Sequence, residues 1–343
     1  MGRFPSLDGL RCLAVLPVVW HHSTPWAPPG LLGRGPLGVD LFFAISGFLI
    51  TTLLLRERRA HGEVSVGRFY ARRALRIFPA YYLVLGLTAL RTWLWMPAGP
   101  TRDHFLHALP YWATYTSNWF VDFAVPHPVV FAFAWSLATE EQFYAVWPWL
   151  ARAPRWAMPL AAFALLAVDQ GVELGVLGAS WPALARRLIS SIASPICMGA
   201  LLACALDAPR GFALLRVPLA SQASAPAALA LLGALVVDGR APVVVLQLAM
   251  ALLVGACAAR HDHGLRALLE VRPVRFVGTI SYALYLVHVA AITAFKRTLP
   301  ALSADAPLVF AGGLALALPL AYLLHRVLDV PLQPLRARLR PAP

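Results

Sequence analysis

The stretch Leu7-Asp8-Gly9-Leu10-Arg11-Cys12-Leu13-Ala14-Val15-Leu16-Pro17-Val18-Val19-Trp20-His21-His22 carries two widely spaced ionisable side chains through an apolar run. Arg11 and His22 are close to three helical turns apart, so a helix places both on one face with a rise of ~16 Å between them. Ionisable groups within lipid are costly and usually face a bundle interior or a water-filled cavity. We therefore expect this face of the first helix to belong to a functional site.

The composition is that of a membrane protein. Hydrophobic residues make up 59% of the 343 residues and charged residues only 13%, and the mean hydropathy is +0.67. Soluble globular domains carry about 25% charged residues. These values exclude an ordinary soluble domain and favour a chain that crosses a membrane several times.

Ten apolar segments are long enough to span a bilayer at ~1.5 Å per residue. They lie near 8–26, 37–55, 75–96, 131–151, 156–175, 187–206, 223–238, 242–259, 274–295 and 307–328. Most of the 29 lysines and arginines fall in alternate connections, which predicts that both termini are cytoplasmic. The net charge of +13 is thus explained by topology, and no nucleic-acid partner is needed. We predict an all-α, polytopic transmembrane helical bundle of about ten helices, with a membrane domain over 1–330 and a short basic cytoplasmic tail over 331–343.

The second apolar segment begins with Gly38-Val39-Asp40-Leu41-Phe42-Phe43-Ala44-Ile45-Ser46-Gly47. In this topology Asp40 lies at a depth comparable to that of His22, where a carboxylate can fix a histidine tautomer and stabilise the imidazolium. An N-cap role for Asp40 is the alternative, and the two roles are compatible. At Gly47 the missing side chain allows another backbone or a ligand to come close.

Three arginines lie at the predicted cytoplasmic end of the third segment. Arg72, Arg73 and Arg76 share a helix face by their spacing, and guanidinium groups bind phosphate well. The alternative is a positive-inside anchor that contacts lipid head groups.

The fourth segment contains two adjacent carboxyl groups, Glu140 and Glu141. At least one must be protonated, paired or exposed to water. Glu140 is either a structural partner of an arginine such as Arg11 or a catalytic or orienting carboxylate. His288 is a second histidine within an apolar segment.

Other features carry weaker signals. The four cysteines fall in apolar runs without C-x-x-C spacing, and the histidine pairs in the connections have no further ligands nearby, so we expect no disulfide and no metal site. The connection over 97–130 is rich in aromatic residues. It is long enough to fold over an outward-facing site, although its aromatic residues could equally be interfacial anchors.

Five motifs follow one another in order along almost the whole chain. They are Leu7-Asp8-Gly9-Leu10-Arg11 with His22, Gly38-Val39-Asp40-Leu41-Phe42-Phe43 through Ser46-Gly47-Phe48-Leu49, Arg72-Arg73-Ala74-Leu75-Arg76-Ile77-Phe78-Pro79, Trp135-Ser136-Leu137 through Glu140 to Phe143-Tyr144, and Ser281-Tyr282-Ala283-Leu284-Tyr285-Leu286-Val287-His288. Together they resemble the acyltransferase 3 family of integral-membrane O-acyltransferases, which act on bacterial surface polysaccharides and some antibiotics. The chain departs from the family at Cys12, where glycine is common, and in its short, alanine-rich second half.

The resemblance implies transfer of an acyl group, usually acetyl, from cytoplasmic acyl-CoA to a hydroxyl group of a glycan or glycosylated small molecule. It places the protein in the bacterial cytoplasmic membrane. The family's arginine-x10-histidine pattern matches Arg11 and His22, and its arginine-x-x-arginine pattern matches Arg73 and Arg76.

Residue roles follow from combining the resemblance with the physical argument. We expect acyl-CoA to be bound by Arg11, Arg72, Arg73 and Arg76. His22, oriented by Asp40 or Glu140, is the expected general base, and a transient acyl-histidine is the mechanistic alternative. The residues expected to bind substrate are Ser46, Tyr144 and His288.

Two rival functions stay open at this stage. One is acylation of a small molecule such as a macrolide sugar. The other is a proton-coupled transporter or flippase whose relay consists of His22, Asp40, Glu140 and His288. Transporters typically contain an inverted repeat, and the sequence has no visible repeat of that kind.

Overall fold

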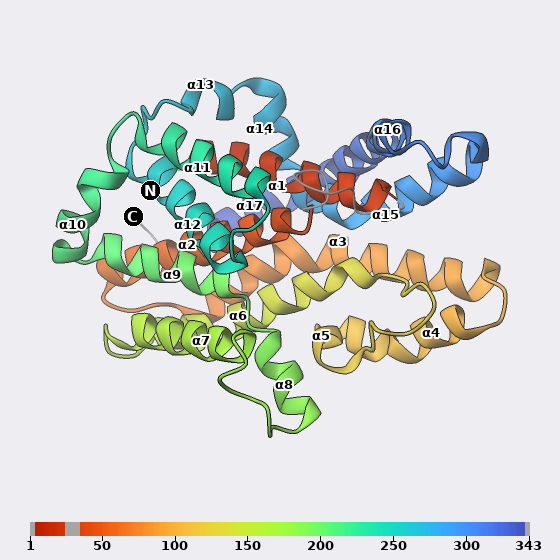
Figure 1. Cartoon of the computed structure of the whole chain (residues 1–343), viewed down its shortest axis with the longest axis horizontal. Coiled ribbons are helices and arrows are strands. Elements are labelled where there is room, and N and C mark those ends of the chain that lie inside the picture. Colours follow the sequence, from red (N-terminus) through yellow and green to blue (C-terminus); the bar gives the residue numbers. More distant parts are fainter. Residues whose placement is uncertain (1–3, 25–34, 340–343) are drawn as a thin grey trace.

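The computed structural model describes residues 4–24 and 35–339, and in these ranges the regular elements are all helices (Figure 1). The predicted all-α class is therefore confirmed. The end of the first predicted span, most of the connection to the second, and the last four residues of the tail lie outside the described ranges. The α-helices are α1 (Pro5–Ser23), α2 (Leu37–His61), α3 (Val66–Trp95), α4 (Pro100–Ala113), α5 (Ser117–Phe120), α6 (Trp135–Arg152), α7 (Ala157–Glu173), α8 (Ala183–Ser190), α9 (Ser194–Asp207), α10 (Pro209–Leu219), α11 (Ser224–Asp238), α12 (Val243–Ala259), α13 (Arg266–Leu269), α14 (Arg272–Thr279), α15 (Ser281–Thr298), α16 (Ala306–Leu324) and α17 (Val330–Arg338).

Within the described residues, three helical stretches are long and apolar enough to cross a bilayer: α2, α3 and the continuous run Ala306–Arg338. Three further pairs of helices pass the same test together, although each pair is bent at a short break, which gives up to six spans. The bends are 48° between α8 and α9, 72° between α10 and α11, and 77° between α14 and α15. The number of ten spans and the cytoplasmic termini stay predictions.

Large apolar side chains on the outside of the bundle support a membrane environment. Trp93 on α3 is 60% exposed, Phe163 on α7 is 62% exposed and Leu323 on α16 is 57% exposed. Exposed apolar surface over several helices is unfavourable in water and favourable against lipid tails.

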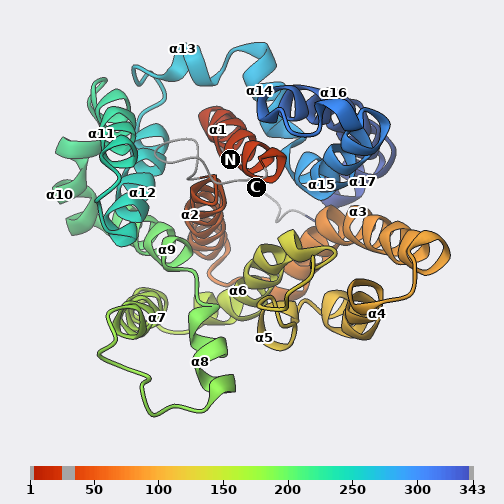
Figure 2. The same ribbon diagram turned by 45° about the vertical axis from the view of Figure 1, so that its right-hand side comes forward.

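Helices α1 and α2 lie at the centre of the bundle, where α2 packs against α1, α6, α9 and α12 (Figure 2). Glycine permits the closest of these contacts. A Cβ atom on Gly47 would lie 2.0 Å from the carbonyl oxygen of Ile196 on α9, and one on Gly199 would lie 2.3 Å from that of Ala44. The expectation that Gly47 admits a neighbouring backbone is confirmed, and that backbone is α9.

The connection predicted over 97–130 contains two helices, α4 and α5. Pro100 starts α4, where its missing N–H has no helical partner to lose. Phe105, Ala108 and Trp112 follow at helical spacing and are buried. This amphipathic pattern explains why the segment folds against α3 instead of forming an irregular loop.

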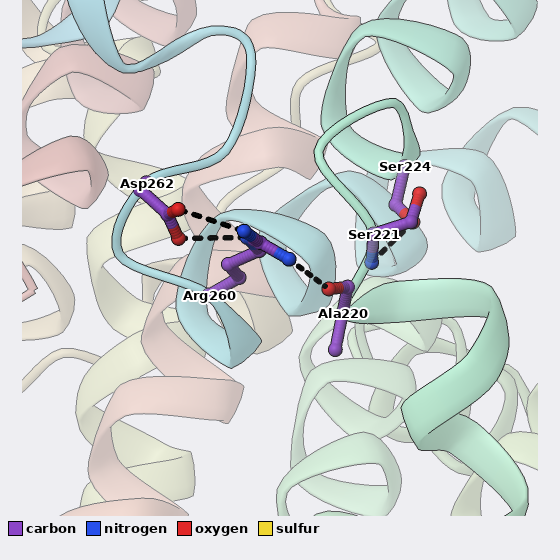
Figure 3. A network of polar contacts seen from close by, with 5 residues as sticks. All are labelled: Ala220, Ser221, Ser224, Arg260 and Asp262. Carbon is purple, nitrogen blue, oxygen red and sulfur yellow. Dashed lines mark hydrogen bonds and ion pairs between the residues drawn. The ribbon is translucent and has the colours of Figure 1, made fainter.

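A polar network joins two connections between helices (Figure 3). The guanidinium of Arg260 donates from Nε and Nη2 to the carboxylate of Asp262, at 2.7 Å for both bonds, and from Nη1 to the carbonyl oxygen of Ala220 at 3.2 Å. These hydrogen bonds lower the pKa of the Asp262 carboxyl to about 2. The network ties the α10–α11 turn to the segment after α12.

Candidate functional site

Two cavities lie between the central helices, and most of the polar residues singled out in the sequence line one of them. The inner cavity has a volume of ≈ 90 Å³ and includes Arg11, Arg73, Arg76, Ser46, Glu140, Glu141 and Tyr144 in its lining. The outer cavity has a volume of ≈ 590 Å³ and includes His21, His22, Asn118, His127, Ser190 and Ser191. Val39 and Tyr285 line both cavities, so these two side chains stand where the cavities meet.

Positive charge reaches the inner cavity from three helices: arginines lie on α1 and α3, and α15 contributes its N-terminal end. Arg11 comes from α1, and Arg73 and Arg76 come from α3. The guanidinium of Arg73 lies over the ring of Tyr144, with 4.3 Å between its Cζ atom and the ring centroid. Arg11 also forms an ion pair with Asp8 at 2.8 Å. The break before α15 places Ser281 in the lining, so the positive end of that helix dipole adds to the arginine charges.

Glu140 and Ser46 contact each other in this cavity. The Ser46 hydroxyl on α2 donates a hydrogen bond to the Glu140 carboxylate on α6. Arg73 and Arg11 lie close enough for their charges to act on Glu140. The structure thus gives Glu140 partners among the inner-cavity residues, away from the expected pairing with His22.

Arg72 lies apart from the other two arginines. Its Nη2 atom is 3.0 Å from the Glu57 carboxylate, which is almost completely buried, and its Nη1 donates to the carbonyl oxygen of Leu339 at 2.8 Å. Arg72 is thus not among the residues that line the inner cavity with Arg73 and Arg76, and its part in donor binding stays a prediction. Arg72 joins the α2–α3 corner to the end of α17, because the buried Glu57 requires a cationic partner.

The contacts of His22 in the outer cavity define its tautomer. The Nδ1 atom of His22 lies 2.9 Å from the carbonyl oxygen of Val18, one turn earlier on α1. A carbonyl oxygen can only accept, so we assign the proton to Nδ1. The lone pair of a neutral His22 ring is then on Nε2, as a general base requires.

His288 on α15 supports the same tautomer from the other side. Its own Nδ1 donates to the carbonyl oxygen of Tyr285 at 2.6 Å, which leaves Nε2 as an acceptor. This Nε2 faces Nδ1 of His22 at 3.3 Å. His288 is completely buried, so the partner of His22 is another imidazole where a carboxylate was expected.

Asp40 has a different neighbour. Its carboxylate accepts a hydrogen bond of 3.3 Å from Nε2 of Gln247 on α12. The prediction that Asp40 orients His22 is therefore not supported by the contacts that the structure describes. The side chain lies in the first turn of α2, on the side that packs against α12.

Sequence reasoning missed two polar groups that shape the cavities. The Tyr285 hydroxyl lies 2.7 Å from the Ser136 hydroxyl and donates to the carbonyl oxygen of Phe133 at 2.9 Å. At the outer cavity, the side-chain amide of the lining residue Asn118 exchanges hydrogen bonds of 3.0 and 2.8 Å with the amide of Gln142. The sequence signal for these groups is a polar residue inside an apolar segment, but such a signal does not identify the residue's hydrogen-bond partner.

Comparison with known proteins identifies the family. The model of the acyltransferase 3 family, described as an acyltransferase domain, matches residues 4–326. The peptidoglycan O-acetyltransferase of Listeria monocytogenes is 34% identical over 152 residues, which are 42% of this chain and 23% of that protein. A putative peptidoglycan O-acetyltransferase of Bacillus subtilis is 33% identical over 186 residues, 50% of this chain and 28% of the relative. A putative O-acetyltransferase of Staphylococcus aureus is 38% identical over 156 residues, 43% of this chain and 24% of the relative.

The similarity therefore spans about a quarter of the length of these relatives. No solved structure matches the chain. The family model, by contrast, covers all five motifs and both cavities in one continuous match. This protein belongs to the acyltransferase 3 family.

Proposed function

We propose that the protein is an integral-membrane O-acyltransferase of the bacterial cytoplasmic membrane. It moves an acyl group, in the simplest case acetyl, from acyl-CoA to a hydroxyl group of a cell-envelope glycan. One observation carries the proposal: a basic inner cavity and a histidine-bearing outer cavity meet at Val39 and Tyr285. The family membership and the names of the relatives support acyl transfer and a glycan acceptor.

The inner cavity fits the thioester end of the donor. Its ≈ 90 Å³ is well below the ~300–1,000 Å³ of pockets that enclose whole small ligands. The nucleotide must therefore stay at the mouth, where Arg76 is exposed and Arg73 lies one helical turn away. Guanidinium groups suit the phosphates of coenzyme A, and Phe42 and Phe43 provide an apolar lining further in.

The outer cavity fits a polar acceptor. Its ≈ 590 Å³ is large enough for a sugar unit, and the lining offers the Asn118 amide oxygen and the Ser190 and Ser191 hydroxyl oxygens as hydrogen-bond acceptors. Glycan hydroxyls can donate to such oxygens, so this lining suits them.

The proposed reaction needs one base and one leaving group. Nε2 of His22 takes the proton of the acceptor hydroxyl while the hydroxyl oxygen attacks the thioester carbonyl carbon. The new C–O bond forms, the C–S bond breaks, and the imidazolium returns the proton to the departing thiolate. The products are an O-acyl ester and free coenzyme A. His288 accepts from the opposite ring nitrogen and stabilises the transient imidazolium.

The described contacts do not favour the alternative function of a proton-coupled transporter or flippase. Of the four residues of the proposed relay, only His22 and His288 contact each other. Asp40 contacts Gln247, and Glu140 contacts Ser46, so the described residues form no continuous proton path.

A binding experiment tests the donor site. Purified protein in nanodiscs is titrated with acetyl-CoA by calorimetry, beside the Arg73→Ala/Arg76→Ala double variant. We expect binding by the native protein and a loss of at least ~10-fold in affinity in the double variant, because charge-assisted bonds to phosphate contribute strongly. Folded native protein that does not bind acetyl-CoA would overturn the proposal and favour a transport function.

A further inference from the structure

We infer that Val39 sets the size of the acyl group that the protein transfers. This inference rests on the proposed function and deepens it, since it names a residue that selects the donor. Val39 and Tyr285 are the two residues shared by the linings of the inner and outer cavities. An acyl carbon held between the charged inner groups and His22 must therefore lie against these two side chains.

Tyr285 is held in place. Its hydroxyl contacts Ser136 and the Phe133 carbonyl oxygen, and its ring packs edge-on against the rings of Phe42 and Phe133. A buried tyrosine with a satisfied hydroxyl and ring contacts on two sides has little freedom to move. The free space at the junction is consequently determined on the opposite side, by Val39.

The backbone that carries Val39 is fixed as well. A Cβ atom on Gly38 would lie 2.2 Å from the carbonyl oxygen of Ala14, so the first turn of α2 is pressed directly against α1. On the other side of Val39, the Asp40 carboxylate is bound by Gln247 of α12. The first turn of α2 is thus held on both sides and cannot shift to admit a larger group. The size of the side chain at position 39 then limits the passage.

The lining explains why this limit acts on the acyl group. The charged residues lie on one side of the junction and His22 on the other. Beside Val39, the inner cavity is lined by Phe42, Phe43 and Leu137, which suit an alkyl chain and not a phosphate. One extra methylene in a close-fitting apolar site changes kcat/KM by ~10–200-fold. Acetyl should therefore be strongly preferred over propionyl and butyryl.

The test compares acyl donors on purified native protein, Val39→Ala and Val39→Ile in nanodiscs. Release of free coenzyme A is measured with acetyl-, propionyl- and butyryl-CoA, with purified peptidoglycan strands as acceptor. Val84→Ala is the matched control, because Val84 and Val39 are both 8% exposed and Val84 lines neither cavity. Thermal unfolding of each variant establishes that it is folded.

We expect Val39→Ala to reduce the preference for acetyl over propionyl by ~10-fold, and Val39→Ile to lower even the acetyl rate. Val84→Ala should keep the native donor preference. Native protein that transfers acetyl, with an unchanged donor preference in both folded Val39 variants, overturns this inference and leaves the proposed function standing. Native protein that uses none of the three thioesters overturns both.

Discussion

The Nε2 atom of His288 lies 3.3 Å from the Nδ1 atom of His22. The first belongs to α15 and the second to α1, so two segments at opposite ends of the chain meet at the proposed base. Because Nδ1 of His288 is bound to a carbonyl oxygen, its Nε2 can only accept in the neutral ring. The pair therefore presents the Nε2 lone pair of His22 for proton transfer.

This relationship makes His288 a positioning residue with a testable chemical signature. His288→Leu removes the imidazole that accepts from His22 and leaves the Val18 carbonyl oxygen as the remaining partner of Nδ1. We expect kcat to fall by at least ~10²-fold with little change in the KM for the glycan. His288→Gln places an amide oxygen near the position of Nε2, so it should recover part of that loss. Steady-state kinetics on the two variants measures the difference. Equal activity in both would contradict an orienting hydrogen bond.

A conservative substitution tests whether Asp40 acts directly on His22 or only anchors α2. Asp40→Asn removes the charge but keeps an oxygen that can accept from Gln247. If the carboxylate only anchors the first turn of α2, Asp40→Asn should keep activity within ~10-fold of native, whereas Asp40→Leu should lose more. A collapse of kcat in Asp40→Asn, in folded protein, would restore a direct electrostatic role toward His22.

Substitution of Arg72 is expected to lower stability, whereas substitution of its neighbour Arg73 is expected to weaken donor binding. Arg72→Ala leaves the buried Glu57 carboxylate without its ion-pair partner, which typically costs about 3–5 kcal/mol of stability. The Arg72→Ala/Glu57→Gln double variant should regain part of that loss. Arg73→Ala should instead raise the KM for acetyl-CoA with a smaller effect on thermal unfolding. Unfolding curves and donor kinetics on the same preparations check both expectations, and a raised donor KM in the stable double variant would assign Arg72 to the donor site after all.

The contact between α2 and α9 gives a prediction about stability alone. Gly47→Ala places a methyl group 2.0 Å from the Ile196 carbonyl oxygen, and a backbone atom cannot move aside cheaply. We expect a loss of about 1–3 kcal/mol. Gly233→Ala is the control, because nothing lies within 4 Å of its added Cβ atom in the interior of α11, and alanine favours the helix by ~0.5–1 kcal/mol. Similar melting temperatures for the two variants would show that the helices can separate without penalty.

The sequence was informative about which residues matter and less so about how they pair. Ionisable groups in apolar segments identified His22, Glu140, Arg73 and Arg76, and the structure places them around two adjoining cavities. Helical spacing could not separate Arg72 from Arg73, because it relates residues on one helix and contains no information about Glu57 on the helix before. Likewise, the depth shared by Asp40 and His22 did not reveal which way each helix is rotated about its own axis.

Bent helices and short amphipathic ones limited the prediction of the fold. The all-helical class follows from composition, but α14 and α15 are separated by a 77° bend inside one predicted span. Hydropathy records how apolar a stretch is and does not detect such a break. The buried face of α4 was likewise hidden within a predicted connection, because its apolar residues are interleaved with a histidine and a proline.

If His22 is the base for acyl transfer, its replacement should abolish transfer and leave donor binding intact. Acetyl transfer from acetyl-CoA to peptidoglycan strands is measured for native protein and for His22→Ala in nanodiscs, with acetyl-CoA binding and thermal unfolding followed in parallel. We expect His22→Ala to fold and to bind acetyl-CoA as the native protein does, while transfer falls by ~10²–10⁴-fold. Near-native transfer by folded His22→Ala would show that His22 is not the base.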